Sequence, residues 1–406
     1  MKNTISAFLL GTAMALSVAS MASADDKVVK IGVLSDQSGL YADLAGPGST
    51  LAAQMAIEDS GLKAKGWTID LISGDHQNKP DIGTTIARQW FDVDKVDTIV
   101  DVPNSGVALA VNNVVKEKNG VYINSGAATS DLTNAQCTPN TVHWTYDTYM
   151  LAHATGQALV KAGGDTWFFL TADYAFGAAL ERDTTAVITA NGGKVVGGVK
   201  HPLNTADFSS FLLQAQASKA KIIGLANAGG DTTNSIKQAA EFGIVKGGQK
   251  LAALLLFLTD VKAIGLETAQ GLNFTETFYW DLNDNTRAFS KRFSEKMKSG
   301  APPTMVQAGV YAGLLHYFKA LEALGGNPHD GAKVVAKMKT IPTDDPLFGK
   351  GEVEANGRVT HDAYLFEVKK PSESKGPWDF YKLVGTVPGN QAFTPLDKST
   401  CALLKK

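Results

Sequence analysis

Residues 121–133 read VYINSGAATSDLT and join an apolar run to a loop built only of small residues. Val121, Tyr122 and Ile123 are typical of a short, fully buried strand. The residues that follow, 124–131, include no bulky side chain, so either the backbone turns tightly there or something else fills the space. We interpret the segment as a strand end in an open α/β sheet, because ligands bind beyond the carboxyl ends of such strands.

The same alternation of apolar runs and helical patterns extends along the whole chain. Ten strands are predicted, at 28–34, 67–73, 97–102, 121–124, 167–171, 194–199, 221–226, 252–256, 272–278 and 359–369. The helices predicted between them cover 49–60, 82–91, 107–118, 150–161, 177–191, 208–218, 233–242, 286–298, 305–323 and 331–339. Strands that alternate with helices predict parallel sheets with helices on both faces. The alternation of strands and helices runs from residue 28 to residue 124 and begins again at residue 167. This predicts two doubly wound lobes with a crossover at 144–147.

The N-terminus has the pattern of an export signal. Lys2 is followed by an apolar run, and residues 22–24 (ASA) match a cleavage site, so residues 1–24 are predicted to be a signal peptide. A membrane anchor is the alternative, but the run is short and ends in small residues. We therefore expect a periplasmic protein that is not inserted in a membrane. Its net charge of −2 argues against nucleic acid as a partner.

The chain has two cysteines, Cys137 and Cys401. Export places them in an oxidising compartment, where a disulfide between them is the favoured interpretation and two free thiols are the alternative. The bond would tie the C-terminal tail to a loop near the middle of the chain. Without it, we expect the tail to fray.

Two loops without bulk are predicted to lie at the same sheet edge. Residues 103–106 (PNSG) follow the third strand, and residues 125–129 (SGAAT) follow the fourth. Helix N-termini also point to this edge, and their free N–H groups suit a carboxylate or phosphate. Ser105 and Thr129 offer hydroxyl donors there, and Ala127 offers its N–H. The loops thus predict an anion-binding site, here called the anion seat, formed by Ser105, Ala127 and Thr129. Ordinary turn and capping chemistry is the alternative.

Aromatic residues also fall at predicted strand ends. Tyr41 lies in the first such loop, Tyr174 and Phe176 follow the strand at 167–171, and Trp280 follows the strand at 272–278. Aromatic walls with a few polar groups are typical of a small-molecule site. For each aromatic alone, packing in the core or at a rim is the alternative. Their shared position favours a binding cleft.

Several of these segments resemble one known family. Residues 29–39 (VKIGVLSDQSG) resemble the opening of the periplasmic branched-chain amino-acid binding proteins, which are receptors of ABC importers. Residues 125–133 are similar to that family's small-residue loop, and residues 173–177 (DYAFG) to its aromatic-glycine motif. Further similarity lies at 271–272 and in 306–313 (VQAGVYAG). The resemblance spans nearly all of the chain after residue 24.

The resemblance implies a type I periplasmic binding protein, with two Rossmann-like lobes joined by three hinge crossovers. We expect lobe 1 to comprise residues 25–145 and 278–350, and lobe 2 to comprise 146–277 and 351–406. It also implies that Ser105, Ala127 and Thr129 hold the carboxylate of a ligand. Phe176, with Tyr174, would cover the ligand from the other lobe.

One departure from the family bears on the ligand. Amino-acid binders of this family hold the ammonium group with an acidic residue from the second lobe. That position falls within residues 255–258 (LLFL), which are apolar, with Asp260 close by. An unpaired ammonium in a dry cleft would cost several kcal/mol. We therefore expect a carboxylate without an α-amine, such as an aromatic or other organic acid, with Asn227 and Thr259 as neutral contacts.

The sequence has no motif that predicts catalysis. It lacks a G-x-S-x-G elbow, an H-E-x-x-H pair and a P-loop, and its seven histidines show no metal-ligand spacing. We expect no metal and no cofactor. The favoured function is a monomeric substrate-binding protein, not an enzyme, whose macromolecular partners are the permease subunits of an ABC importer. A sensor of the same fold, which signals to a receptor or regulator, is the alternative, and a secreted enzyme is disfavoured.

Overall fold

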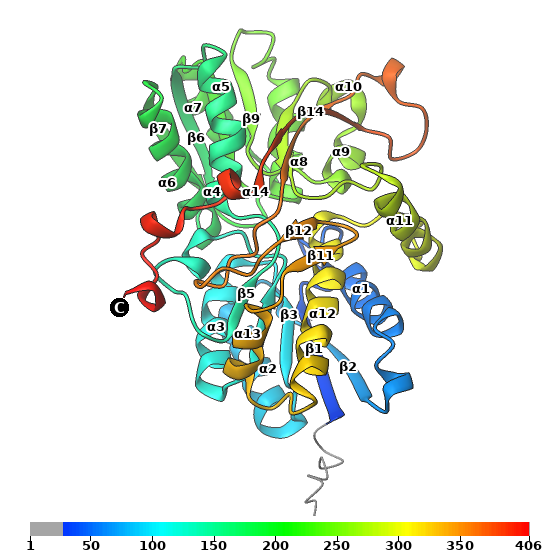
Figure 1. The fold of residues 1–406 in the computed structure, drawn as a ribbon. Coiled ribbons are helices and arrows are strands. Elements are labelled where there is room, and N and C mark those ends of the chain that lie inside the picture. The colour runs from blue at the N-terminus through cyan, green and yellow to red at the C-terminus, as the bar shows by residue number, and fades with distance from the viewer. Residues whose placement is uncertain (1–26, 406) are drawn as a thin grey trace, which may run out of the picture.

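The computed structural model describes residues 27–405 as two α/β lobes placed end to end (Figure 1). The predicted signal peptide lies outside the described residues. The first sheet forms the centre of one lobe, and the second parallel sheet forms the centre of the other. The fold class predicted from the sequence is confirmed.

The first lobe is built on a parallel sheet with the strand order β2-β1-β3-β4-β5. Helices α1 and α12 pack against each other on one side of it, with α13 beside α12, while α2 and α3 pack together. The strands are β1 (Val28–Ser35), β2 (Thr68–Asp75), β3 (Thr98–Asp101), β4 (Val121–Asn124) and β5 (Thr141–His143). The helices are α1 (Gly46–Asp59), α2 (Pro80–Gln89), α3 (Ser105–Lys118), α11 (Asp284–Lys296), α12 (Met305–Leu324) and α13 (Gly331–Met338).

Successive side chains of β4 point to opposite faces of the sheet, and both faces are covered by helices. Val121 and Ile123 join the core cluster under α12 and α13, whereas Tyr122 joins the cluster under α3. All three side chains are buried. A strand with both faces covered needs apolar residues at every position, and this is why the run at 121–123 is continuous and not alternating.

The second lobe contains another parallel sheet, with the order β7-β6-β8-β9. Its strands are β6 (Thr166–Ala172), β7 (Lys194–His201), β8 (Ile222–Ala226) and β9 (Lys250–Ala253). Its helices are α4 (Thr148–Leu151), α5 (Gln157–Lys161), α6 (Ala175–Ala190), α7 (Ser209–Ala217), α8 (Gly230–Glu241), α9 (Leu258–Ile264) and α10 (Leu266–Ala269). The strand predicted at 252–256 ends earlier than expected, and its last residues lead into α9.

The C-terminal strands correct the expectation that all sheets are parallel. β10 (Asn273–Glu276), β13 (Ala363–Val368) and β14 (Tyr381–Val387) form an antiparallel sheet in the order β10-β13-β14. Phe274, Phe366 and Tyr381 from this sheet pack in the same core cluster as β6 and β8. A short hairpin of β11 (Thr343–Asp345) and β12 (Gly349–Gly351) lies between β10 and β13 in the sequence. The apolar runs predicted β10 and β13, but not their direction of pairing.

Three segments carry the chain between the lobes. They connect β5 to α4, β10 to α11 and β12 to β13. Arg358, in the third, bonds through Nη1 to Asp147 Oδ2 in the first at 3.4 Å, and through Nη2 to the carbonyl of Thr145. The first and third crossovers are therefore fixed to each other. The residue boundaries that we assigned to the lobes stay a prediction.

The predicted disulfide is confirmed. Cys137 and Cys401 are bonded, with their Cα atoms 5.6 Å apart. Between residues 27 and 405, no helix combines the length and the apolar character that crossing a membrane would require.

Candidate ligand-binding cleft

A small cavity lies where the two lobes meet. It spans about 230 Å³ of space free of atoms, part of which is open to solvent, and loops from both lobes line it. The first lobe supplies residues from the loops after β1, β3 and β4, and the second supplies residues after β6, β8 and β9. The lining residues are Tyr41, Leu44, Pro103, Gly126, Ala128, Tyr146, Tyr174, Phe176, Ala228, Leu255 and Phe257.

Asp36 shapes the first of these loops. Its carboxylate accepts hydrogen bonds from the backbone N–H of Gly39 at 2.7 Å and of Tyr41 at 2.8 Å. The side-chain amide of Asn78 donates to the same carboxylate at 2.6 Å. These bonds fold residues 36–41 into a tight turn that positions the ring of Tyr41 in the cavity.

Tyrosine hydroxyls form the polar part of the lining. Tyr41 and Tyr174, one from each lobe, lie with their phenolic oxygens 2.6 Å apart. Tyr146, from the first crossover, donates to the carbonyl of Gly126 at 2.6 Å. Burial raises the pKa of all three hydroxyls, so they are neutral donors and acceptors at physiological pH.

The three residues of the predicted anion seat, Ser105, Ala127 and Thr129, lie behind the cavity lining and not in it. Ser105 begins α3, and its hydroxyl accepts a hydrogen bond from the N–H of Thr129 at 3.3 Å. The Thr129 hydroxyl accepts from the N–H of Asp131 at 3.3 Å. The N–H of Ala127 donates to Asn124 Oδ1 at 3.0 Å. Ser105 and Thr129 are therefore neighbours, as predicted, whereas the Ala127 amide already has a partner inside its own loop.

The small residues of the loop are explained partly by close packing. A Cβ atom on Gly126 would lie 2.7 Å from the Cα of Pro103 and 2.6 Å from Asp101 Oδ1, so only glycine fits. The last residue of β3, Asp101, and the next residue, Val102, are both left-handed, with φ of 79° and 59°. Such conformations cost about 1–3 kcal/mol each outside glycine. They direct the chain abruptly so that Pro103 reaches the cavity.

A buried acid lies directly beneath this loop. Asp101 accepts hydrogen bonds from the hydroxyls of Ser35 at 2.7 Å and Ser125 at 3.5 Å. Burial raises its pKa to about 7, because removal from water disfavours the carboxylate more than the serine donors stabilise it. Asp101 is thus a structural acid under the cavity floor, with its side chain fully buried.

Residues 255–258 are the region where amino-acid binders of this family are expected to hold an acid. Here this region contributes only apolar side chains to the cavity. Leu255 and Phe257 line the cavity, and Phe257 packs edge-on against Tyr146. Asp260 instead accepts from the backbone N–H of Phe257 at 2.9 Å and from Thr233 at 3.5 Å. It therefore caps the start of α9. Among the described residues that line the cavity, none carries a charged side chain.

The remaining predicted contacts lie away from the lining. Asn227 accepts from the Thr232 hydroxyl at 2.8 Å and has its amide 3.2 Å from His201 Nε2, inside the second lobe. Thr259 is half-buried on the first turn of α9. Trp280 donates through its indole nitrogen to the carbonyl of Trp378 at 2.9 Å. This bond and the packing of Trp280 against the ring of Tyr279 hold the indole outside the cavity lining.

Sequence reasoning did not assign several lining residues. Tyr146 lies in the predicted crossover at 144–147, where no strand end marked it as a cleft residue. Phe257 and Leu255 were recognised only as an apolar run without an acid. Over residues 27–405, no group of three or more histidine, cysteine, aspartate or glutamate side chains is arranged to hold a metal ion.

Two α/β lobes that are joined by crossovers and meet around a cavity lined mainly by aromatic side chains are typical of solute-binding proteins. Residues 28–376 match the family described as periplasmic binding protein, and the chain belongs to that family. Leu/Ile/Val-binding protein homolog 6 of Brucella melitensis is 26% identical over 370 residues, which cover 89% of this chain and 93% of the relative. The resemblance recognised in the sequence is confirmed.

Solved structures of periplasmic binding proteins have the same fold as this chain. A periplasmic binding protein from Burkholderia mallei is 54% identical, with a TM-score of 0.90, and the match covers 93% of this chain and all of that one (100%). A branched-chain amino-acid ABC transporter periplasmic ligand-binding protein from Burkholderia xenovorans is 44% identical, with a TM-score of 0.82 and the same coverage, 93% and 100%. The chain is therefore a periplasmic solute-binding protein of the ABC-transporter type, and its family consists of substrate-binding proteins.

More distant structures show the same fold with ligands. A solute-binding protein from R. palustris in complex with benzoate is 23% identical, with a TM-score of 0.81 and coverage of 92% and 99%. Another, in complex with 4-hydroxybenzoate, is 24% identical, with a TM-score of 0.81 and coverage of 93% and 100%. At this identity the likeness establishes the fold and not the ligand.

Proposed function

We propose that this protein captures a small carboxylate that has no α-amino group, such as an aromatic or other organic acid, and delivers it to the permease of an ABC importer. The observation that carries the proposal is the cavity lining, in which tyrosine, phenylalanine and leucine side chains stand where an amino-acid binder needs an acid. Capture would follow hinge closure, because a ligand that binds the closed form better shifts the population towards it.

The ammonium group of an amino acid would have no charged partner in this cavity. The nearest acid of the apolar region, Asp260, has its carboxylate oxygens occupied by the Phe257 N–H and the Thr233 hydroxyl. Burial raises the pKa of Asp260 to about 7, which weakens it further as a permanent anion. A buried ammonium without a partner costs several kcal/mol, so binding favours ligands that lack it.

The carboxylate end of the ligand would approach the loops at 103–106 and 125–129. The Ser105 and Thr129 hydroxyls each accept one hydrogen bond from the backbone, so each still has its own hydrogen to donate. α3 begins at Ser105, and its N-terminus adds a favourable electrostatic field for an anion. Because the Ala127 N–H is bonded to Asn124, we assign the two hydroxyls as the main donors.

The body of the ligand would lie against aromatic rings from both lobes. Tyr41 and Tyr146 flank it from the first lobe and the crossover, and Phe176 and Phe257 from the second lobe. The bond between Tyr41 and Tyr174 also offers a hydroxyl pair to a polar substituent of the ligand. The complexes with benzoate and 4-hydroxybenzoate in proteins of this fold are compatible with such a site.

The proposal is tested with ligands that differ only in the α-amine. Calorimetric titrations compare 3-phenylpropanoate with phenylalanine and 4-methylpentanoate with leucine, and add benzoate and 4-hydroxybenzoate. We expect at least one amine-free acid to bind, and each to bind more tightly than its amino-acid counterpart. A hundredfold excess over Kd should stabilise the protein by about 2.7 kcal/mol. Binding of amino acids alone would refute the proposed ligand class.

A further inference from the structure

Besides the three crossovers, the C-terminal tail also reaches from the second lobe to the first. β14 ends at Val387, and residues 388–405, here called the C-terminal strap, descend along one side of the molecule towards the first lobe (Figure 1). The N–H of Gly389 donates to Asp362 Oδ1 at 3.0 Å. The ring of Phe393 lies 4.2 Å from the guanidinium of Arg358 and 5.3 Å from the ring of His361. The strap therefore starts by packing on the third crossover.

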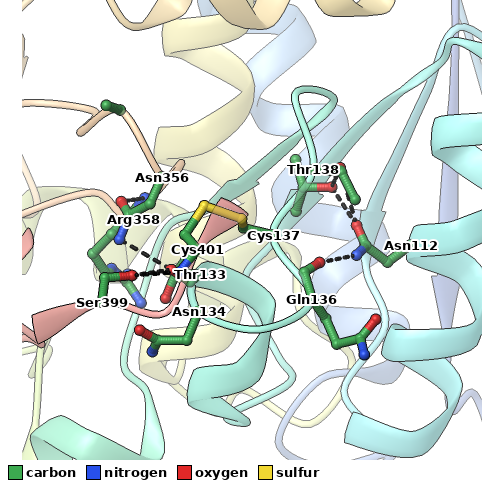
Figure 2. The surroundings of a disulfide bond; sticks show 12 residues. Asn112, Thr133, Asn134, Gln136, Cys137, Thr138, Asn356, Arg358, Ser399 and Cys401 are labelled. Carbon is green, nitrogen blue, oxygen red and sulfur yellow. Dashed lines mark hydrogen bonds between the residues drawn. A yellow bond between two sulfur atoms is a disulfide. The ribbon is translucent and has the colours of Figure 1, made fainter. Parts of the chain in front are cut away.

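The far end of the strap is anchored to the first lobe by the disulfide (Figure 2). Cys401 is fully buried, and its partner Cys137 stands between two residues that are bonded to α3. Asn112, on α3, donates through its amide to the carbonyl of Gln136 at 2.8 Å and accepts from the Thr138 hydroxyl at 3.4 Å. The disulfide thus joins the strap to a rigid part of the first lobe.

Between these two anchors, the strap supports the segment that follows the anion seat. The carbonyl of Thr133 accepts hydrogen bonds from Asn356 Nδ2 and from the Ser399 hydroxyl, both at 3.1 Å (Figure 2). Thr133 is the last residue of a 3-10 turn, Ser130–Thr133, that Thr129 caps at its start. Both donors come from segments more than 200 residues away in sequence, with separations of 223 and 266. One carbonyl next to the seat is therefore fixed from two distant parts of the chain.

We propose that the C-terminal strap positions the ligand loop, residues 125–133, and that the Cys137–Cys401 disulfide is the anchor through which it acts. The disulfide holds Ser399 beside Thr133, since the Ser399 hydroxyl also accepts from the N–H of Cys401 at 3.3 Å. A binding loop that is already held in its bound conformation loses less entropy when the ligand arrives. Loss of the anchor leaves the loop free to sample other conformations, and ligand affinity falls.

The affinity part of this inference rests on the proposed function, whereas the loop part does not. The test therefore has two arms on the full mature protein. Hydrogen exchange of the ligand-free protein measures protection of residues 125–133. Calorimetry with 3-phenylpropanoate and 4-hydroxybenzoate measures affinity. The variants are Cys137→Ser/Cys401→Ser, Ser399→Ala and Ser399→Thr, with Leu403→Ala as a control because Leu403 lies beyond the anchor and is exposed.

We expect faster exchange across residues 125–133 in the double cysteine variant, and affinity weaker by roughly threefold to tenfold, the range of one hydrogen bond. Ser399→Ala should reproduce part of both effects, and Ser399→Thr, which keeps the hydroxyl, should restore wild-type behaviour. Leu403→Ala should change neither. If the double variant does not fold, reduction of the folded wild-type protein with dithiothreitol gives the same comparison.

In the double cysteine variant, faster exchange confined to residues 394–405, with residues 125–133 unchanged, would overturn the inference. The disulfide would then stabilise only the C-terminal tail. Unchanged affinity alongside faster loop exchange would likewise overturn the positioning role. If neither acid binds the wild-type protein, the proposed ligand class fails, and the exchange arm still decides whether the strap holds the loop.

Discussion

The hydroxyl oxygens of Tyr41 and Tyr174 lie 2.6 Å apart, and their hydrogen bond joins the first lobe to the second at the cavity. Asp36 fixes the backbone of Tyr41, and Tyr174 stands at the start of α6, so both rings are held by rigid elements. Nearby, the side chain of Leu40 packs against the backbone of Gly230, where a Cβ would be 2.8 Å from it. Separation of the two lobes would break both contacts.

The tyrosine pair should therefore slow ligand release. Tyr174→Phe keeps the ring and removes the bond, and the loss of one hydrogen bond of about 0.5–1.5 kcal/mol predicts dissociation faster by about twofold to tenfold. Stopped-flow measurement of the dissociation rate checks this. Tyr149→Phe is the matched control, because Tyr149 stacks on His153 outside the cavity lining. Equal rates in the two variants would mean that the pair does not gate release.

The Thr129 hydroxyl is predicted to donate to the ligand carboxylate. Thr129→Val keeps the shape of the side chain and removes this donor, and hydrogen bonds to charged groups contribute about 1.5–3 kcal/mol. We expect affinity to fall by about tenfold to a hundredfold, measured by calorimetry. Thr129→Ser retains the hydroxyl and should bind nearly as the wild type does. Ser105→Ala should weaken binding in the same direction, and unchanged affinity in both Thr129→Val and Ser105→Ala would remove the anion seat.

Leu255 should decide between amine-free acids and amino acids. Its side chain lines the cavity and is buried. Leu255→Asp supplies the missing anion, so it should repel 3-phenylpropanoate and gain affinity for phenylalanine relative to it. Leu255→Asn, of the same shape but neutral, should shift the ratio of the two dissociation constants far less. Titration of both ligands into both variants checks the prediction, and an unchanged ratio in Leu255→Asp would contradict it.

Much of the cleft could be predicted from sequence because the carboxyl ends of parallel strands share one edge. Tyr41, Tyr174 and Phe176 follow β1 and β6, and the structure places all three in the cavity lining. Ser105 and Thr129 follow neighbouring strands, β3 and β4, and they meet. Their contacts with a ligand stay a prediction. In each case, local pattern and parallel topology point to the same place.

Other residues could not be placed because their positions depend on distant parts of the chain. Trp280 has the same local pattern as Tyr174, but its indole pairs with the carbonyl of Trp378, 98 residues later in the chain. No local signal gives that pairing. The Ala127 amide could be identified as a donor, but not its bond to Asn124, which depends on a side-chain rotamer. Tyr146 reaches the cavity from a crossover, where periodicity carries no information.

The buried acid Asp101 should make stability depend on pH. Its pKa is raised to about 7 in the folded protein, against about 3.9 in an unfolded chain. Between these values the folded state holds a proton that the unfolded state has released, so this contribution to stability falls as pH rises from about 4 to 7. The slope approaches about 1.4 kcal/mol per pH unit.

Asp101→Asn cannot ionise and should lose this dependence. Urea unfolding at pH 5 and pH 7.5 should show that the free energy of unfolding of the variant, relative to wild type, rises with pH. Other buried acids affect both proteins equally and cancel in the difference. Asp70→Asn, at an exposed position on β2, is the control and should give a constant difference. A parallel pH response of Asp101→Asn and wild type would contradict the assignment.

Arg358 should be a main determinant of hinge stability, because its guanidinium is buried between two crossovers. It bonds to Asp147 at 3.4 Å and through Nε to the carbonyl of Val359 at 3.0 Å. Arg358→Met leaves Asp147 buried without its cation, which predicts a loss of about 3–5 kcal/mol in urea unfolding. Arg358→Met/Asp147→Asn should recover part of it. Arg287→Met, which breaks exposed ion pairs, should cost at most about 1 kcal/mol. If Arg358→Met were as stable as Arg287→Met, the crossovers would be held by other contacts.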